Sequence, residues 1–197
     1  MLAVAILAAG ESRRMGTPKA LLPYRGKTFV EHLLDVTQHP RVGIIRVVLG
    51  AGADNIREKL RLDASAVVVN PDWPQGQLSS IQAAIRSLPQ GGTEGLILCP
   101  VDHPLVSAAL VARLIEAFDQ NPKAAIVVPT YRGRRGHPVV FRAPLYGELL
   151  GASLAVGARQ VVWAHAAEVV EVPTDEEGVV LNLNDAATLQ RAMENSE

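Results

Sequence analysis

The sequence contains a single cysteine, Cys99, among its 197 residues. One thiol excludes an internal disulfide and a cysteine-rich zinc site. A chain without disulfides fits a reducing compartment, and we expect a cytoplasmic protein. Cys99 lies inside an apolar run, where a free cysteine usually packs as a small hydrophobic residue.

Long apolar runs and an excess of charge are also missing. No stretch approaches the roughly 18 apolar residues of a membrane span, and residues 1–9 lack the basic segment that opens a signal peptide. The net charge of −1 provides no overall field to attract nucleic acid or an anionic membrane. We therefore expect neither partner, and any anion site must be local.

What the sequence does contain is an ordinary globular balance, with 48% hydrophobic and 20% charged residues and no repeats or low-complexity segments. Short apolar runs alternate with longer stretches in which apolar residues recur every three or four positions. The short runs predict strands over residues 2–7, 44–49, 66–69, 96–101, 125–128, 139–141, 169–172 and 179–183. The longer stretches predict helices over residues 29–37, 54–60, 77–88, 108–118, 145–150, 158–165 and 186–194.

This order of elements predicts one α/β domain over residues 1–197. Repeated β-α-β units with continuous apolar strands are typical of a three-layer α/β/α, Rossmann-like fold. Its sheet is mainly parallel, and we expect a late antiparallel element. Ligands in such folds bind beyond the carboxyl ends of the strands. The loops that follow residues 7, 69 and 101 are rich in Gly, Pro or charge, so we expect the site there.

The first of these loops is both basic and rich in glycine. Residues 7–22 read LAAGESRRMGTPKALL. Gly10 and Gly16 allow backbone N–H groups to turn toward a ligand. Arg14 and Lys19 add positive charge suited to phosphate oxygens. The pattern favours a polyphosphate ligand over the alternative, a solvated basic turn.

Two common phosphate motifs are absent from this loop. A Walker loop needs four residues between its glycines and a lysine directly after the second. Here five residues separate the glycines, and Lys19 lies beyond Thr17 and Pro18. The G-x-G-x-x-G fingerprint of dinucleotide-binding proteins is also missing.

The loop instead resembles the signature of a known family. L-A-A-G-x-S-x-R-M-G-x-P-K is similar to the opening motif of nucleotidyltransferases with the nucleotide-diphospho-sugar transferase fold, in particular the molybdenum cofactor cytidylyltransferases and their relatives. The resemblance continues through GQLSSI (76–81), CPVDHP (99–104) and GRRGHPVVF (133–141), and so spans most of the chain. The opening motif is shared with many sugar nucleotidyltransferases, whereas the combination is more specific.

The resemblance implies a single nucleotidyltransferase domain, with Arg14, Lys19 and Asp102 as its catalytic residues. It also implies a set of nucleotide-binding residues: Leu7, Ala8, Ala9, Gly10, Arg14, Gly16, Lys19, Asn70, Ser79 and Ser80. Ser79 and Ser80 follow Gly76 at the start of a predicted helix. Hydroxyls there can bind a phosphate or a base edge, or simply cap the helix.

Asp102 follows an apolar strand, where a carboxylate can hold Mg²⁺ together with a phosphate. The alternative is a cap for the next helix, but Ser107 is better placed for that role. The resemblance implies that Asp102 binds the metal. In VLNLND (180–185), at the place of a late family motif, Asn182 is a second candidate metal ligand. The alternative there is a turn that leads into the last helix.

The resemblance places the G-H-P loop near a second substrate, the acceptor. His137 is then a candidate acceptor contact, although a structural histidine is the alternative. Arg134 and Arg135 would bind the acceptor's phosphate, unless they form a solvated turn. Trp73 is either a loop anchor or a stacking face.

The reaction implied is transfer of a nucleoside monophosphate from CTP to the phosphate of molybdenum-molybdopterin, with Mg²⁺ as cofactor and pyrophosphate released. CTP rather than GTP is expected from Ala9, because guanylyltransferase relatives more often have glycine there and the methyl group narrows the base pocket. The alternatives are a GTP-using molybdopterin guanylyltransferase and a sugar- or polyol-phosphate nucleotidyltransferase. A non-enzymatic alternative is an insertion factor that delivers cofactor to a molybdenum hydroxylase apoprotein, which is also a possible partner of the enzyme.

Overall fold

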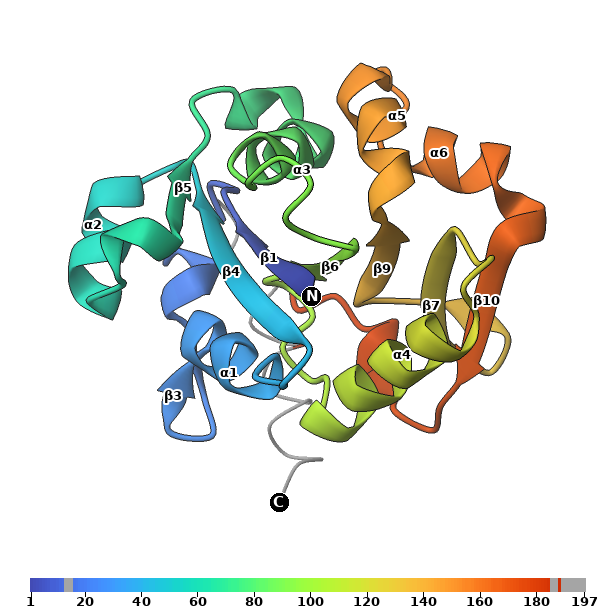
Figure 1. Ribbon diagram of the computed structural model, residues 1–197. Coiled ribbons are helices and arrows are strands. Elements are labelled where there is room, and N and C mark those ends of the chain that lie inside the picture. The colour runs from blue at the N-terminus through green and yellow to red at the C-terminus, as the bar shows by residue number, and fades with distance from the viewer. Residues whose placement is uncertain (13–15, 185–187, 189–197) are drawn as a thin grey trace.

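The computed structural model describes residues 1–12, 16–184 and 188. One mixed sheet runs through the molecule, with the strand order β10-β7-β9-β6-β1-β4-β5 and with β8 paired to β7 (Figure 1). A small hairpin, β2 (Pro23–Tyr24) and β3 (Lys27–Thr28), stands outside it. The mainly parallel three-layer α/β architecture predicted from the sequence is confirmed.

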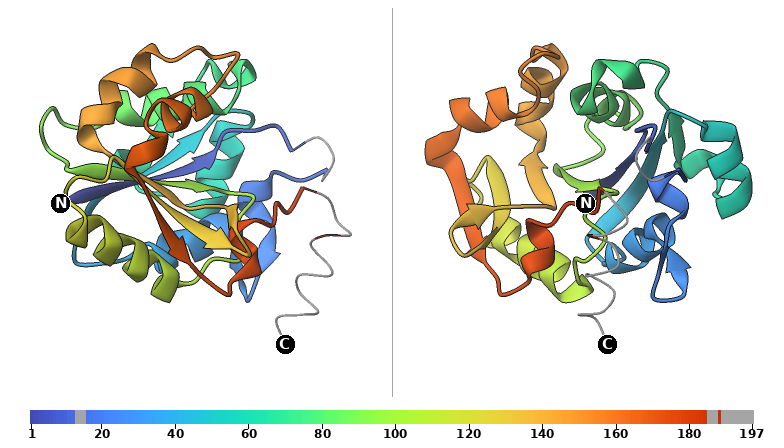
Figure 2. Two further views of the ribbon diagram at one scale, coloured as in Figure 1. Left: turned by 90° about the vertical axis from the view of Figure 1, so that its right-hand side faces the viewer. Right: turned by 180° about the vertical axis from the view of Figure 1, so that it is seen from behind.

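The centre of the sheet is parallel and completely buried. β1 (Leu2–Ala8) lies between β4 (Val42–Leu49) and β6 (Gly95–Pro100), and β5 (Val67–Val69) pairs with the far side of β4. Every residue of β1 is buried because helices cover both faces. All these strands end at the same edge. In the left panel of Figure 2, β1 runs from the amino terminus toward the opening loop at that edge.

Alternate side chains of the strands point into two hydrophobic cores. Leu2, Val4 and Ile6 of β1 pack with α1 (Phe29–Val36), α2 (Ala53–Leu60) and α4 (Ala108–Gln120). Ala3, Ala5 and Leu7 pack with α3 (Gln77–Arg86), α5 (Tyr146–Gly151) and α6 (Arg159–Ala164). Figure 1 shows these two helical layers on opposite faces of the sheet.

α1 and α4 begin at residues whose side chains cap them. Thr28 caps α1 in a capping box with Glu31. The Ser107 hydroxyl accepts a hydrogen bond from the backbone N–H of Leu110 at 3.1 Å and so caps α4, as predicted. Because Ser107 does this, the carboxylate of Asp102 is not used as a cap.

The carboxyl-terminal part of the sheet contains the antiparallel element. β9 (Val139–Arg142) runs antiparallel to both β6 and β7 (Ile126–Tyr131), and β10 (Val169–Pro173) is parallel to β7. Val139 pairs with Leu98, near the end of β6. The reversed direction of β9 therefore brings the residues before it to the edge where β1 and β6 end.

Short turns connect the main elements. One extra strand, β8 (Arg134–Arg135), pairs with the end of β7. The 3₁₀ turns are η2 (Lys19–Leu21), η3 (Ala64–Ala66), η4 (Trp73–Gln75), η5 (Ala143–Leu145), η6 (Ala166–Glu168) and η7 (Glu177–Val179).

In the part of the chain that the structure describes, no helix is both long and apolar enough to cross a bilayer.

The predicted strand over residues 179–183 is wrong. Val179 ends a 3₁₀ turn, and the chain then continues without regular structure. Val179 and Leu183 are fully buried, so their apolar character reflects core packing rather than sheet pairing. The backbone N–H of Leu183 donates to the carbonyl of Asp102 at 2.8 Å. The predicted helix over residues 186–194 lies outside the described residues, apart from residue 188.

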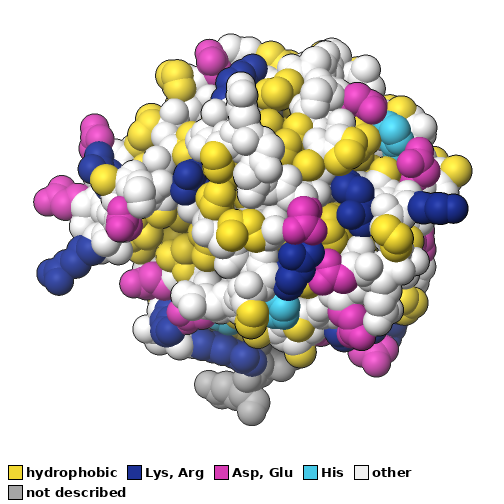
Figure 3. Space-filling view, in the orientation of Figure 1, with side chains coloured by type: hydrophobic (Ala, Val, Ile, Leu, Met, Phe, Trp, Pro, Cys, Tyr) yellow, Lys and Arg dark blue, Asp and Glu magenta, His cyan; other side chains and the backbone are white. Residues whose placement is uncertain are grey.

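The surface on which the strands begin carries mixed charge. Figure 3 shows basic and acidic side chains interspersed on this face, as a net charge of −1 leads one to expect. Leu7, Lys19 and Asp102, three of the functional residues predicted from the sequence, lie at the opposite edge, where the strands end.

Candidate active site

A cavity of about 330 Å³, here called the first cavity, opens where β1 and β6 end. Leu7 of β1 and Pro100 of β6 are paired in the sheet, so the loops that follow them start side by side. The residues that line the cavity are Leu7, Ala8, Ala9, Gly10, Ser12, Lys19, Ala20, Trp73, Pro74, Gly76, Gln77, Ser80, Pro100, Val101 and Asp102. The cavity therefore joins the three loops that the sequence marked as candidates.

The opening loop folds back so that Lys19 covers this cavity. Ser12 has a left-handed backbone with φ 55°, and its hydroxyl accepts a hydrogen bond from the Lys19 backbone N–H at 2.9 Å. Gly16 also has a positive φ of 65°, which suits a residue without a side chain. Gly16 does not line the cavity. The predicted catalytic residue Arg14 lies outside the described residues.

Lys19, Asp102 and Asn184 meet at one end of the first cavity. The Nζ of Lys19 lies 3.7 Å from Oδ2 of Asp102, and it donates a hydrogen bond to Oδ1 of Asn184. The side chains of Lys19 and Asp102 are only 16% and 26% exposed. The ammonium group of Lys19, the carboxylate of Asp102 and the amide of Asn184 are thus held together where water has only partial access.

Asn184, not the predicted Asn182, contributes its side chain to this cluster. Asn182 is exposed, and its side chain makes no hydrogen bond within the described residues. The contact between Leu183 and Asp102 fixes the segment one residue before Asn184. The backbone N–H of Asn184 also donates to the carbonyl of Asn182 at 3.0 Å, so the chain turns between the two asparagines and their side chains diverge.

The described residues contain no group of three His, Cys, Asp or Glu side chains that could hold a metal ion. Asp102 and Asn184 offer a carboxylate oxygen and an amide oxygen, the donors that Mg²⁺ and Mn²⁺ accept. Two such donors fit an ion that takes its remaining ligands from phosphate oxygens and water.

The serines at the start of α3 have different roles. The side chain of Asn70 donates to the hydroxyls of Ser79 at 2.9 Å and of Ser80 at 3.1 Å. The Ser79 hydroxyl itself donates to the carbonyls of Asp72 and Gly76. Ser79 therefore fastens the preceding loop to the helix, but it does not cap α3, which has no side-chain cap. Ser80 lines the first cavity, and buried Asn70 supports both serines.

Trp73 forms a wall of the first cavity and also anchors the opening loop. A methyl group on Gly50 would lie 2.6 Å from the carbonyl oxygen of Ala9 and 2.6 Å from Cγ of Trp73. Only glycine allows this approach. The Ala51 N–H donates to the same carbonyl at 3.0 Å. Trp73 thus packs against the backbone at Gly50 and lines the cavity, while its role as a stacking face stays a prediction.

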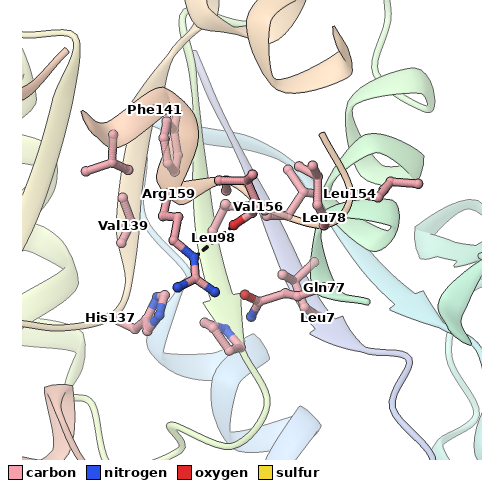
Figure 4. A pocket seen from close by; sticks show the side chains of 16 residues that line it. Leu7, Gln77, Leu78, Leu98, His137, Val139, Phe141, Leu154, Val156 and Arg159 are labelled. Carbon is pink, nitrogen blue, oxygen red and sulfur yellow. Dashed lines mark hydrogen bonds between the residues drawn. The ribbon is translucent and has the colours of Figure 1, made fainter. Parts of the chain in front are cut away.

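A second cavity of about 370 Å³ adjoins the first and shares Leu7, Gln77 and Pro100 with it. Its other lining residues are Leu78, Ile81, Leu98, His137, Val139, Phe141, Leu154, Ala155, Val156, Gly157, Ala158, Arg159 and Val162. Figure 4 shows the guanidinium of Arg159 and the side chains of His137 and Gln77 pointing toward one another inside it.

His137 lies in the wall of the second cavity, next to His103. Their ring centroids are 4.8 Å apart, and the His137 Nδ1 is buried without a hydrogen-bond partner in the described part of the chain. Burial, together with the nearby His103, lowers the pKa of His137 to about 4. Burial also lowers the pKa of His103. Both rings are therefore neutral near pH 7, and His137 supplies no positive charge.

The structure does not bring Arg134 and Arg135 to either cavity. Both are exposed on β8, beyond the turn at Arg132 and Gly133. The Nε of Arg135 donates to a carboxylate oxygen of Glu171 at 2.7 Å on the outer part of the sheet. Of the residues in the G-R-R-G-H-P segment, His137 is the one that lines either of these two cavities.

The model of the MobA-like NTP transferase domain matches residues 4–169, which is most of the chain. The chain belongs to this family. A molybdenum cofactor guanylyltransferase from Cereibacter sphaeroides is 32% identical to it over 194 residues, covering 95% of this chain and 93% of that protein. A nicotine blue oxidoreductase from Paenarthrobacter nicotinovorans is 35% identical over 146 residues, covering 71% and 70% respectively.

Solved structures show the same MobA-like fold over nearly the whole chain. The crystal structure of Rv0371c from Mycobacterium tuberculosis H37Rv has a TM-score of 0.79 and 30% identity, covering 98% of this chain and 97% of that one. The same protein has also been solved as a complex with manganese, with a TM-score of 0.72, 30% identity and 98% coverage of both chains.

Three residues of this MobA-like site escaped the sequence analysis. Asn184 lies two residues after Asn182, and the sequence contains no local signal to choose between them. Gln77 begins a helix and joins the two cavities, but a lone glutamine carries no pattern. Arg159 lies in a loop-to-helix segment that no motif covers, and only the tertiary structure brings it to His137.

Proposed function

We propose that this protein transfers a nucleoside monophosphate from a nucleoside triphosphate to the phosphate of a molybdopterin, and releases pyrophosphate. The observation that carries the proposal is the position of Lys19 beside Asp102, at the end of a cavity formed by the glycine-rich opening loop. The triphosphate would lie in the first cavity against Gly10 and Lys19. Arg14 joins them in this proposal.

Asp102 and Asn184 would hold the divalent ion, for which we propose Mg²⁺. When bound, the ion would neutralise charge on the phosphates and hold their oxygens in line. The manganese complex of the similar Rv0371c structure supports a divalent ion in this fold. On substrate binding, the hydrogen bond between Lys19 and Asn184 would break. Lys19 would then bind phosphate oxygens, and Asn184 would bind the ion.

The reaction needs charge neutralisation more than proton transfer. Both substrates are anions, so their repulsion is the first barrier, and Lys19 lowers it. The attacking oxygen belongs to a phosphate that is already ionised near pH 7, so no general base is required. The neutral His103 and His137 are consistent with a mechanism in which histidine carries no charge.

For the nucleotide we propose CTP, with GTP as the alternative. Ala9 is 6% exposed and lines the first cavity, so its methyl group takes space that a purine would need. The guanylyltransferase name of the Cereibacter relative favours GTP instead. A single methyl group in a pocket typically changes the choice between substrates by about 10- to 200-fold.

We propose a cytoplasmic enzyme whose product serves a molybdenum hydroxylase apoprotein. The alternative without catalysis is an insertion factor that delivers finished cofactor to that apoprotein. Lys19 and Asp102 favour catalysis, because an insertion factor does not need a cation and a carboxylate held together at one end of the first cavity.

The decisive experiment mixes the protein with molybdenum-loaded molybdopterin, Mg²⁺ and each of the four nucleoside triphosphates in turn, and identifies the product by mass. A cytosine dinucleotide of molybdopterin supports the proposal in full, and a guanine dinucleotide supports the alternative nucleotide. Glucose 1-phosphate and erythritol 4-phosphate as acceptors test the sugar and polyol alternative. If no product forms from any acceptor and pyrophosphate release stays at background, the proposal that this protein is a nucleotidyltransferase is wrong.

A further inference from the structure

The segment that carries Asn184 is fastened to the loop that carries Asp102. Residues 176–184, here called the strap, lie against residues 102–107, which connect β6 to α4. The backbone N–H of Leu183 donates to the carbonyl of Asp102 at 2.8 Å. The strap therefore supplies one of the two proposed metal donors and also holds the backbone of the residue that supplies the other.

The middle of the strap packs closely on its neighbours. A methyl group on Gly178 would lie 2.8 Å from the carbonyl oxygen of Leu105, so the approach requires glycine. The Nδ1 of His103 lies 3.5 Å from the carbonyl oxygen of Gly178. The carbonyl of Val179 accepts a hydrogen bond from the backbone N–H of His137 at 2.9 Å. The strap is thus in contact with both the loop after β6 and the segment before β9.

The strap begins with a carboxylate that binds the far end of the loop after β6. Oε2 of Glu176 accepts a hydrogen bond from the backbone N–H of Ser107 at 3.0 Å, and Oε1 accepts one from the Ser107 hydroxyl at 2.6 Å. The backbone N–H of Glu176 donates to the Thr174 hydroxyl at 3.2 Å. Because Ser107 caps the 13-residue helix α4, the hydrogen bonds and the helix dipole both favour a negative charge here.

The contact between Glu176 and Ser107 needs a carboxylate. Ser107 presents two donors, its backbone N–H and its hydroxyl, and the hydroxyl already accepts a hydrogen bond from the backbone N–H of Leu110. Glutamine has one acceptor oxygen and would turn its NH₂ group toward one of these donors. In the described part of the chain Glu176 forms no ion pair, so its charge serves this contact.

We propose that Glu176 is a positioning residue for the metal site. Its carboxylate fixes the start of the strap to the start of α4. The strap then fixes the backbone of Asp102, and the side chain of Asn184 extends from the same segment to Lys19. Glu176 acts through the backbone of the strap rather than on the ion. This inference rests on the proposed function, which assigns the ion to Asp102 and Asn184.

The first test uses the protein without metal or nucleotide. Glu176→Gln should speed hydrogen exchange at the Leu183 amide by at least tenfold, because a loosened strap opens its bond to Asp102 more often. The Leu114 amide lies inside α4 and reports on the helix and the core. It should exchange as it does in the wild type. Nuclear magnetic resonance follows both amides in one sample.

The second test measures metal binding. Glu176→Gln should weaken the binding of Mn²⁺ by about 10-fold in the presence of CTP or of GTP, the size of effect seen when a residue that orients a metal ligand is lost. Electron paramagnetic resonance of free Mn²⁺ gives the affinity. Binding of the same nucleotides in EDTA should be unchanged. Glu176→Asp keeps both acceptor oxygens on a shorter side chain and should restore part of the exchange protection and of the Mn²⁺ affinity.

The matched control is Glu177→Gln, which removes the same charge from the next, exposed residue. It should change neither the exchange of the Leu183 amide nor the affinity for Mn²⁺. An equal loss of Mn²⁺ affinity in both variants would mean that charge, not position, matters, and would overturn the inference. Unchanged exchange at Leu183 in Glu176→Gln would also overturn it, as would equal acceleration at Leu183 and Leu114, which would make Glu176 a general stabilising residue.

The outcomes are separable from those for the proposed function. If the wild type transfers nucleotide but Glu176→Gln leaves the Leu183 exchange and the Mn²⁺ affinity unchanged, the inference fails alone. If both readouts respond as expected but the wild type never transfers nucleotide, the proposed function fails and the positioning role of Glu176 stands.

Discussion

The ammonium group of Lys19 lies 3.7 Å from a carboxylate oxygen of Asp102, although the two residues are far apart in the sequence. They meet because β1 and β6 are parallel neighbours whose following loops leave the sheet at the same edge. Each can bind one part of a metal–nucleotide complex. The lysine can bind phosphate oxygens, and the carboxylate can bind the divalent ion. Without a nucleotide they balance one another.

Replacing Lys19 with methionine should lower the rate of nucleotidyl transfer by about 10²- to 10³-fold, because it removes a positive charge aimed at the phosphates. The measurement is pyrophosphate release at saturating nucleotide. Lys27→Met is the matched control, since Lys27 is an exposed lysine paired with Asp35 on the β3–α1 surface. A Lys19→Met protein with wild-type turnover would remove the central argument for catalysis.

Asn184→Ala should weaken the binding of Mn²⁺ in the presence of nucleotide by about 10-fold or more, by analogy with the loss of a supporting ligand at other metal sites. Asn182→Ala, two residues earlier and exposed, should not. Electron paramagnetic resonance of free Mn²⁺ measures both variants directly. The reverse order of effects would restore the assignment made from the sequence.

Ala9→Gly should shift the preference between CTP and GTP toward GTP by about 10-fold, because the methyl group no longer narrows the first cavity. The ratio of kcat/KM for the two nucleotides is the quantity to measure. Ala66→Gly is the control for added backbone freedom, because Ala66 in η3 lines neither cavity. An unchanged ratio in Ala9→Gly would leave the nucleotide choice without a structural basis.

Gly136→Ala should destabilise the protein by about 1–3 kcal/mol, because the new methyl group would overpack a backbone contact. It would lie 2.2 Å from the carbonyl oxygen of Val179. The clash pushes on the segment that places Asn184 near Asp102, so metal binding should weaken as well.

Gly147→Ala provides the matched control for this change, since nothing lies within 4 Å of the added methyl group in α5. It should be neutral or stabilise the protein by up to about 1 kcal/mol. Chemical denaturation of the three proteins gives the free energies of unfolding. Equal stability of the two variants would contradict the close approach at Gly136.

His165 should stabilise the fold in a pH-dependent manner. Its two ring nitrogens lie 2.9 Å from carboxylate oxygens of Glu168 and Glu148, and these hydrogen bonds raise its pKa above the ordinary 6.5. A raised pKa in the folded state means that the contribution is complete below the unfolded value and disappears as the pH rises through the folded value.

His165→Gln should therefore lower the Tm at about pH 5.5 more than at about pH 9, where the histidine is neutral in both states. Thermal unfolding at the two pH values measures this directly. In a protein that already carries Glu148→Gln and Glu168→Gln, the same histidine replacement should lose its pH dependence. A pH-independent effect of His165→Gln in the otherwise unchanged chain would mean that the ion pairs contribute nothing.

The sequence by itself determined the elements whose signals are local. The apolar run of β1 followed by Gly10 and Lys19 indicated a phosphate loop, because backbone freedom and charge are properties of the residues themselves. Asp102 was identified in the same way, as a carboxylate directly after a buried strand. Alternating strand and helix patterns then fixed the mainly parallel three-layer fold, since parallel strands must be connected by crossovers.

Only the tertiary structure decided which side chains complete the two cavities. Asn184 replaces Asn182 because the hydrogen bond between Leu183 and Asp102 sets the direction of a segment without regular structure. His137 reaches the site because β9 runs antiparallel to β6, whereas Arg134 and Arg135 remain on the outer strand β8. Arg159 comes from the start of α6, far from Leu7 and Gln77 in the sequence. Strand direction and the register of a loop depend on contacts between remote parts of the chain, and no local pattern of residues encodes them.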